Sequence, residues 1–170
     1  MNAKEFIEIY LMDGIGAIQG TGRHDHYYLS FGLITQGIEF LGACLDNGDY
    51  LLQGRSRARF EKAITELFPR DYHKYVGKGC AYDLYANLRC GLLHVVLPGH
   101  DVELIQQAEV SAFGGDNLDI VEVRGKKRLI LVAQAFYNDF KDACEEVRKR
   151  IGNKEISDKK VYNPTLETEP

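Results

Sequence analysis

Features of membrane and secreted proteins are lacking from this sequence. The four cysteines lie far apart and form no CxxC pair, which predicts reduced thiols rather than a disulfide framework or a zinc site. No apolar stretch approaches the roughly 20 residues that cross a bilayer. Charged residues at Lys4, Glu5 and Glu8 interrupt the N-terminus, where a secretion signal would need an apolar core. We therefore expect a cytoplasmic protein that does not enter a membrane.

An excess of positive charge is also lacking. The 21 Lys and Arg residues are outnumbered by 25 Asp and Glu residues, which gives a net charge of -4. This balance excludes a protein that coats nucleic acid through bulk electrostatic attraction. Basic residues do cluster at 55–62 and 126–128, where we interpret them as solvated surface charges. The 170 residues suit one domain with a hydrophobic core.

The spacing of apolar residues predicts helices in the first half of the chain. A helix is expected to begin at Asn2, because Glu5 three residues later completes a capping box. The range 13–22 contains four glycines and is expected to form a loop. From Tyr27 the pattern is strongly helical, with apolar residues at alternating steps of four and three. This expected buried seam comprises Tyr27, Phe31, Ile34, Ile38, Leu41 and Leu45.

The second half alternates between helical and strand patterns. One helix is expected to be capped by Ser56 and stopped by Pro69, because the residue before a proline avoids helical geometry. From about residue 102 the apolar residues recur with the two-residue period of strands, and from residue 133 they recur with the helical period again. The expected elements are helices over 57–68, about 81–96 and 133–151, strands over 102–110, 118–123 and 129–132, and a hairpin turn at 124–127.

These patterns predict a mainly α fold. We expect a four- or five-helix bundle with a small β-hairpin at about 102–132, before the last helix. Residues 1–151 are expected to form a single domain without internal repeats. Residues 152–170 are polar and lack periodicity, so they are expected to be a flexible or peripherally attached tail.

The helix expected over 81–96 carries the candidate functional residues. At 100° per residue, its leucines fall on one side, which must face the core. Polar residues gather opposite, within about 60° of one another; they are His94 and three candidate binding residues, Asp83, Asn87 and Cys90. Arg89 lies about 140° from His94, so the two side chains diverge on a straight helix. They can act together if the helix bends or if two copies of the chain face each other.

The segment Asn87-Leu88-Arg89-Cys90-Gly91-Leu92-Leu93-His94 resembles the signature of HEPN domains (higher eukaryotes and prokaryotes nucleotide-binding). That signature places an Arg, four to six further residues and then a His late in a helical bundle. A looser resemblance covers residues 27–151. It implies a HEPN-like bundle that forms a homodimer with a composite site and cleaves RNA without metal, as in toxin–antitoxin and phage-defence systems. Active members often carry Asn, Asp or His directly after the Arg, where this chain has Cys90.

The resemblance implies that Arg89 clamps a phosphate and that His94 acts as general base or acid. Histidine suits proton transfer because its ordinary pKa lies near neutrality, and arginine presents a planar fork that matches two phosphate oxygens. Cleavage without metal requires the 2′-OH to attack the adjacent phosphorus, so RNA is the expected partner and DNA is not. This chemistry needs no cofactor. A protein partner of the antitoxin kind is also implied.

Other interpretations stay open. Arg89 can instead form a structural pair with Glu39 or a C-terminal carboxylate while His94 caps a helix end, which would make the chain an inactive scaffold or partner-binding protein. The run at 24–26, His-Asp-His, resembles a metal-binding cluster, but no HxxxH or HExxH spacing supports it, so we expect no metal. The glycines at 14–22 lack the Lys-Ser/Thr end of a P-loop, which argues against nucleotide binding there.

Overall fold

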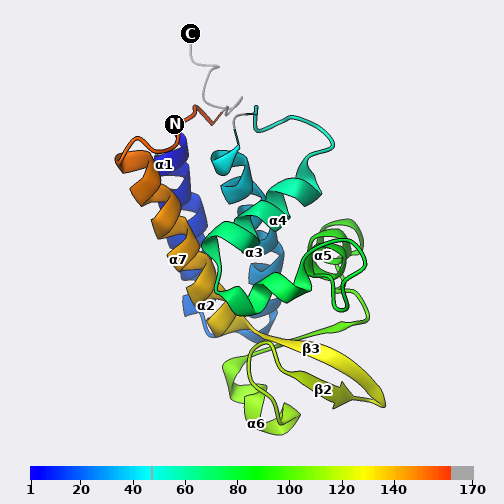
Figure 1. The fold of residues 1–170 in the computed structure, drawn as a ribbon. Coiled ribbons are helices and arrows are strands. Elements are labelled where there is room, and N and C mark those ends of the chain that lie inside the picture. The colour runs from blue at the N-terminus through cyan, green and yellow to red at the C-terminus, as the bar shows by residue number, and fades with distance from the viewer. Residues whose placement is uncertain (47, 162–170) are drawn as a thin grey trace.

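The structure is a computed structural model that describes residues 1–46 and 48–161, without the side chains of His24 and Asp25. It is mainly helical with a small sheet at one end of the helical bundle, as the sequence predicts (Figure 1). The elements are α1 (Ala3–Phe6), a π-helix (Ile7–Gly14), α2 (Ile15–Gly20), α3 (His24–Leu45), α4 (Ser56–Leu67), a 3-10 helix (Arg70–Tyr75), a π-helix (Tyr85–Cys90), α5 (Gly91–Val95), β1 (Val102–Ile105), a 3-10 helix (Gln107–Glu109), α6 (Val110–Phe113), β2 (Ile120–Val123), β3 (Lys126–Val132) and α7 (Ala133–Gly152).

The N-terminal helix is longer than the sequence predicts. Its capping box is confirmed, because the Glu5 backbone N–H donates to Asn2 Oδ1 at 2.9 Å and the Asn2 N–H donates to Glu5 Oε2 at 3.0 Å. The loop predicted over 13–22 is wrong, since α1, the π-helix and α2 follow one another without a break. Burial of Ile15 and Gln19 in the bundle outweighs the low helix propensity of the glycines.

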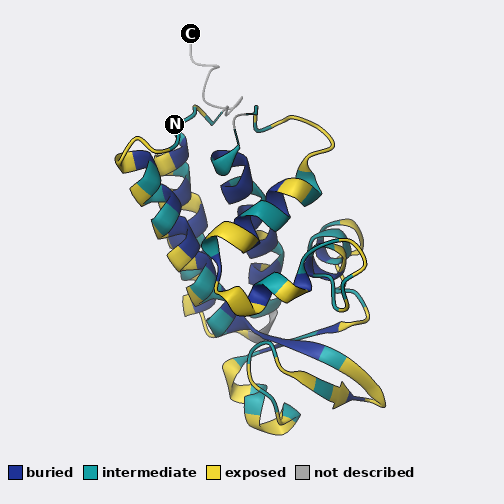
Figure 2. Ribbon diagram, viewed as in Figure 1, coloured by how far each residue is buried: buried dark blue, intermediate teal, exposed yellow. Residues whose placement is uncertain are grey.

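Helix α3 is the centre of the bundle and packs against α4 and α7. Figure 2 shows the buried residues where these helices face one another, and mainly exposed residues on α6 and at the far end of the hairpin. Four residues of the predicted seam are fully buried: Phe31, Ile34, Ile38 and Leu41. A Cβ at Gly42 would lie 1.9 Å from the backbone oxygen of Arg59, so this glycine permits the close approach of α3 and α4.

Helix α4 begins at Ser56, but this serine does not cap it. Arg55 occupies the N-cap position, and the Ser56 hydroxyl donates instead to Glu39 Oε1 of α3 at 2.6 Å. The predicted cap is therefore wrong. The helix ends at Leu67, one residue before the predicted end at Phe68, and Pro69 follows as expected. The serine hydroxyl therefore connects α4 to α3 instead of accepting a hydrogen bond from a backbone N–H at the start of α4.

The β region is a mixed three-stranded sheet rather than an isolated hairpin. Strands β2 and β3 pair antiparallel as predicted, and Arg124 and Gly125 between them have φ values of 52° and 77°, as a type I′ turn requires. In addition, β1 pairs parallel with β3 on its other side, with Val102 opposite Leu129. Strand β3 is therefore central, and its second half is buried and leads directly into α7.

The segment after α7 is attached to the bundle as far as Val161. Lys159 donates from Nζ to three main-chain oxygens at the end of α3 and in the following turn, at 2.5–2.9 Å. Lys160 forms an antiparallel bridge with Asn2. Of the two alternatives predicted for the tail, peripheral attachment therefore applies as far as residue 161. The rest of the predicted tail, residues 162–170, lies outside the described residues.

One described helix is long and apolar enough to span a membrane by length and composition, over His26–Leu45 of α3. Polar residues interrupt the apolar residues of α3, so this helix contains no long uninterrupted apolar run although its average is apolar. About half of this helix, 56% of its most apolar window, is buried inside the fold. That burial is compatible with the core helix of a soluble protein.

Candidate functional site

The helix that carries Arg89 and His94 begins with wide π-helical turns. Asp83 caps its start, because Oδ1 accepts hydrogen bonds from the main-chain N–H groups of Tyr85 at 3.0 Å and Ala86 at 3.3 Å. The π-helical residues then lead into α5, an ordinary α-helix. In a π-turn the hydrogen bonds run from i to i+5, so side chains follow a different register from that of an α-helix.

Arg89 and His94 contact each other within one chain. Arg89 Nη1 lies 3.2 Å from His94 Nε2. On a straight α-helix the two side chains would diverge by about 140°. Here their ends meet across the junction between the π-helical residues, which end at Cys90, and the α-helix α5, which carries His94. A second copy of the chain is not needed to bring these two residues together.

Three helices fix the guanidinium of Arg89. Its Nε donates to Glu39 Oε2 of α3 at 2.8 Å, and its Nη2 donates to the hydroxyl of Ser56 of α4 at 3.2 Å. Burial lowers the pKa of Arg89, but the hydrogen bond to Glu39 and the charge of Glu39 raise it further, so the net shift is upward and the group stays charged. The pairing of Arg89 with Glu39, which the structural interpretation predicted, is confirmed.

The geometry leaves specific groups for a ligand. A guanidinium has five N–H donors and no acceptor. Three donors of Arg89 point at Glu39, Ser56 and His94, which leaves two, one on each terminal nitrogen. Because arginine only donates, Nε2 of His94 accepts, so a neutral His94 ring carries its proton on Nδ1. His94 is exposed. The pair can therefore bind an anionic oxygen and exchange a proton with a neighbouring group.

The other candidate residues do not form a shared polar stripe. Asn87 is buried, where its Nδ2 donates to the backbone oxygen of Asp83 at 2.9 Å and its Oδ1 accepts from the backbone N–H of Asp101 at 3.4 Å. The Asp83 carboxylate also accepts a hydrogen bond from Arg57 at 2.9 Å. Asp83 thus stabilises the start of the helix, and Asn87 attaches the helix to the loop that follows it. Cys90 is half-buried and follows Arg89 directly in the chain.

Two tyrosines at the site were missed by the sequence analysis. The Tyr85 ring lies under two guanidinium groups, with its centroid 5.9 Å from Arg89 Cζ and 4.4 Å from Arg57 Cζ. Its position four residues before Arg89 was a signal that could have identified it. Tyr28 of α3 donates to the backbone oxygen of Val96 at 2.6 Å. Val96 has a φ of 60°, which is unusual for a β-branched residue.

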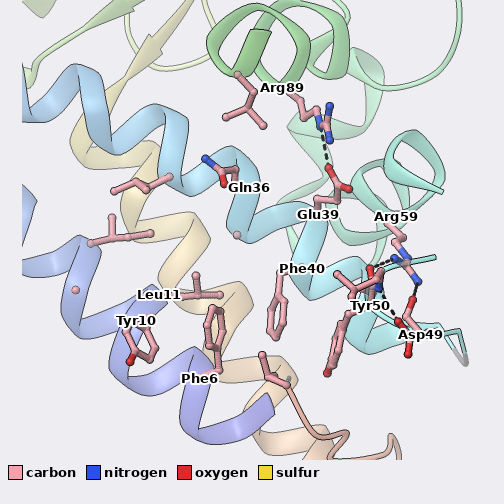
Figure 3. A pocket seen from close by; sticks show the side chains of 18 of the residues that line it. Phe6, Tyr10, Leu11, Gln36, Glu39, Phe40, Asp49, Tyr50, Arg59 and Arg89 are labelled. Atoms are coloured by element: carbon pink, nitrogen blue, oxygen red, sulfur yellow. Dashed lines mark hydrogen bonds and ion pairs between the residues drawn. The ribbon is translucent and has the colours of Figure 1, made fainter. Parts of the chain in front are cut away.

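A cavity of about 870 Å³ begins beside Arg89 and follows α3. Figure 3 shows Arg89 and Gln36 toward one end of the cavity, and Phe6 and Tyr50 toward the other. The helix α3 supplies the floor, and the N-terminal helix and the segment after α3 supply walls. The guanidinium that contacts His94 is therefore also part of the lining of a large, mainly apolar cavity.

Metal ligation finds no support in the part of the chain that the structure describes. There, no group of three or more His, Cys, Asp or Glu side chains is placed to hold a metal ion. His26 Nδ1 lies 2.8 Å from the Thr21 hydroxyl. The His-Asp-His interpretation depends on the side chains of His24 and Asp25, which lie outside the described part of the structure.

All four cysteines are free thiols, and burial raises the pKa of Cys44 to about 11.

Comparison with known proteins adds no identification. No family model, no curated protein and no solved structure matches this chain. The geometry around Arg89 and His94 is therefore the main guide to function.

Proposed function

We propose that this protein is a metal-independent endoribonuclease of the HEPN kind, in which Arg89 clamps the phosphate and His94 transfers the proton. The observation that supports it most directly is the 3.2 Å contact between Arg89 Nη1 and His94 Nε2. Glu39 holds the guanidinium at 2.8 Å from Nε, and with Ser56 and His94 also bound, two N–H donors of Arg89 are left for a substrate. A fixed cation next to an exposed imidazole supplies the phosphate clamp and the base of metal-free RNA cleavage.

The cleavage step follows from these groups. The scissile phosphate binds the terminal nitrogens of Arg89 and replaces His94 at Nη1, which frees the Nε2 lone pair. His94 then accepts the proton of the 2′-OH as that oxygen attacks the phosphorus. The bond from phosphorus to the 5′-oxygen breaks, and this leaving oxygen takes a proton from a second acid. The products are a 2′,3′-cyclic phosphate and a 5′-OH.

The second acid leads us to propose a homodimer. Three consecutive residues after His94, Val95, Val96 and Leu97, are 64%, 63% and 64% exposed, and Leu29 of α3 is 56% exposed. The hydrogen bond from Tyr28 to Val96 holds this loop beside the start of α3, so these apolar groups lie on neighbouring elements. Large exposed apolar groups that cluster favour an interaction surface. In a two-fold dimer through this face, the neutral His94 of one copy accepts the 2′-OH proton, and the protonated His94 of the other copy donates the proton that the leaving 5′-oxygen takes.

A non-enzymatic scaffold or antitoxin-like partner-binding protein is the second candidate function. Arg89 uses three of its donors inside the chain, as a purely structural arginine does. Cys90 also replaces the polar residue that active HEPN members often carry. In either function the protein is proposed to act in the cytoplasm, where its free cysteines stay reduced.

The test is cleavage of RNA by the purified protein in EDTA. Wild type should produce 2′,3′-cyclic phosphate ends, and His94→Ala should produce none. Arg89→Lys should lose most activity, because an ammonium keeps the charge but not the planar fork. His100→Ala is the matched control, since His100 is exposed and lies close by in the chain. Cleavage that persists in both site variants would remove this proposal; an inactive wild type that co-purifies with a protein partner favours the scaffold.

A further inference from the structure

The cavity beside Arg89 is lined by apolar groups along most of its length. One row consists of four rings, Tyr10, Phe6, Phe40 and Tyr50, whose successive centroids lie 5.1, 4.8 and 4.9 Å apart. Aliphatic side chains complete the lining; they are Leu11, Ile15, Ile18, Leu33, Leu51 and Leu93. The volume of about 870 Å³ lies within the range of small-molecule sites. An apolar ligand would release the water that this surface otherwise contacts.

The two ends of the cavity differ in available charge. At one end, Glu39 already neutralises Arg89. At the other end, Lys160 lines the cavity, and its bridge with Asn2 places it next to the start of α1. The Lys160 side chain is exposed, and its ammonium has no acidic partner within residues 1–46 and 48–161. Asp49 and Arg59 also line this end, where Arg59 pairs with Asp46, so Lys160 is the cation that stays available there for an anionic group.

The length of the cavity limits the ligand. Its lining residues on α3 extend from Leu33 to Ala43. At 1.5 Å per residue this path is roughly 15 Å, which an extended alkyl chain of about twelve carbons matches. We propose that the cavity binds a long-chain carboxylate, with the carboxylate at Lys160 and the alkyl chain passing the four rings and following α3 toward Leu33. This site goes beyond the proposed cleavage of RNA and does not depend on it.

Chain length and head group test the proposal on the wild-type protein. A dansyl-labelled undecanoate, whose emission shifts in apolar surroundings, serves as the probe. Octanoate, decanoate, dodecanoate and tetradecanoate should displace it below their micelle concentrations, with affinity increasing about threefold to fourfold per methylene up to dodecanoate. The gain should level off beyond about twelve carbons, when the roughly 15 Å path is filled. No displacement by dodecanoate, or equal affinity for dodecyltrimethylammonium, would overturn the proposal.

Two variants of α3 locate the site. Leu33→Trp fills the cavity and should weaken probe binding at least tenfold, which corresponds to about 1.4 kcal/mol. Leu29→Trp is the matched control, because Leu29 lies one turn earlier on the same helix, is exposed and does not line the cavity. Equal binding by the two variants would place the probe elsewhere. If Leu33→Trp does not fold, the chain-length series on wild type still decides.

Lys160→Glu locates the carboxylate. Reversal of a surface charge should weaken dodecanoate binding about threefold to tenfold. Displacement by dodecanol should stay unchanged, because the alcohol carries no charge. A variant that binds both ligands as well as wild type does would contradict the orientation proposed here. None of these measurements uses RNA, so the failure of this proposal and the failure of the proposed nuclease remain distinguishable.

Discussion

The ion pair between Arg89 and Glu39 should stabilise the fold, and a double-mutant cycle measures by how much. Arg89 Nε and Glu39 Oε2 lie 2.8 Å apart, and the two side chains are only 19% and 23% exposed. A hydrogen bond that involves charged groups contributes about 1.5–3 kcal/mol to stability. Ser56 also donates to Glu39 Oε1 at 2.6 Å, which limits the motion of the carboxylate. We expect an interaction free energy of about 1.5–2.5 kcal/mol between Glu39→Ala and Arg89→Ala.

The assay is urea unfolding of wild type, both single variants and the double variant, followed by circular dichroism. The ion pair of Lys62 and Glu66 is an internal control, because its atoms lie 3.8 Å apart and its side chains are 38% and 42% exposed. Its coupling should be about 0.3–0.5 kcal/mol, as for other exposed helix pairs. A coupling of Arg89 and Glu39 no larger than this control would refute the reasoning, since Glu39 would then not fix the guanidinium beside His94.

Three further outcomes test other parts of the structure. His94→Ala should abolish RNA cleavage but change the free energy of unfolding by no more than about 0.5 kcal/mol, because the residue is exposed. Cleavage assays and thermal melts measure the two effects. An unfolded variant would indicate that His94 has a structural role. Gly42→Ala should cost about 3 kcal/mol or more in urea unfolding, since its Cβ would lie 1.9 Å from the Arg59 backbone oxygen. Gly32→Ala, with open space around it, should instead be neutral or stabilise by up to about 1 kcal/mol, and equal effects would contradict the packing. The thiol of Cys44, whose pKa burial raises to about 11, is only about one-thousandth thiolate at pH 8. Its alkylation, followed by mass spectrometry, should be very slow at pH 8 and accelerate about tenfold per pH unit up to pH 10; rapid labelling of the folded protein at pH 8 would contradict its burial.

The sequence predicts the buried faces of the long helices because helical periodicity is a local property. The seam of α3 is confirmed, and so is the capping box at Asn2. The helix over Ile15–Gly20 was missed because its support is tertiary: Gly16 packs so closely that a Cβ would lie 2.5 Å from the Tyr137 hydroxyl. The parallel pairing of β1 with β3 was missed for the same reason, since it joins distant segments.

The candidate site shows a similar division. The resemblance to the HEPN signature selected Arg89 and His94, whereas helical periodicity at 100° per residue placed the two side chains apart. Periodicity also gives no signal for the π-helical turns that precede α5. Ser56 has the residue type and position of a helix cap, yet its hydroxyl is used by Glu39. The partners that orient the pair come from α3 and α4, far away in the chain. Single-sequence patterns contain no signal for such contacts.

Helix α3 acts as a common frame for both members of the pair. Glu39 of this helix binds Arg89, and Tyr28, three turns earlier, binds the backbone just after His94. The hydrogen bond at Val96 also retains a left-handed backbone conformation that a β-branched residue disfavours. A sliding or rotation of α3 would therefore displace the cation and the imidazole in concert. The distance between the guanidinium and the imidazole would therefore change little during small shifts of the bundle, because both groups are attached to the same helix.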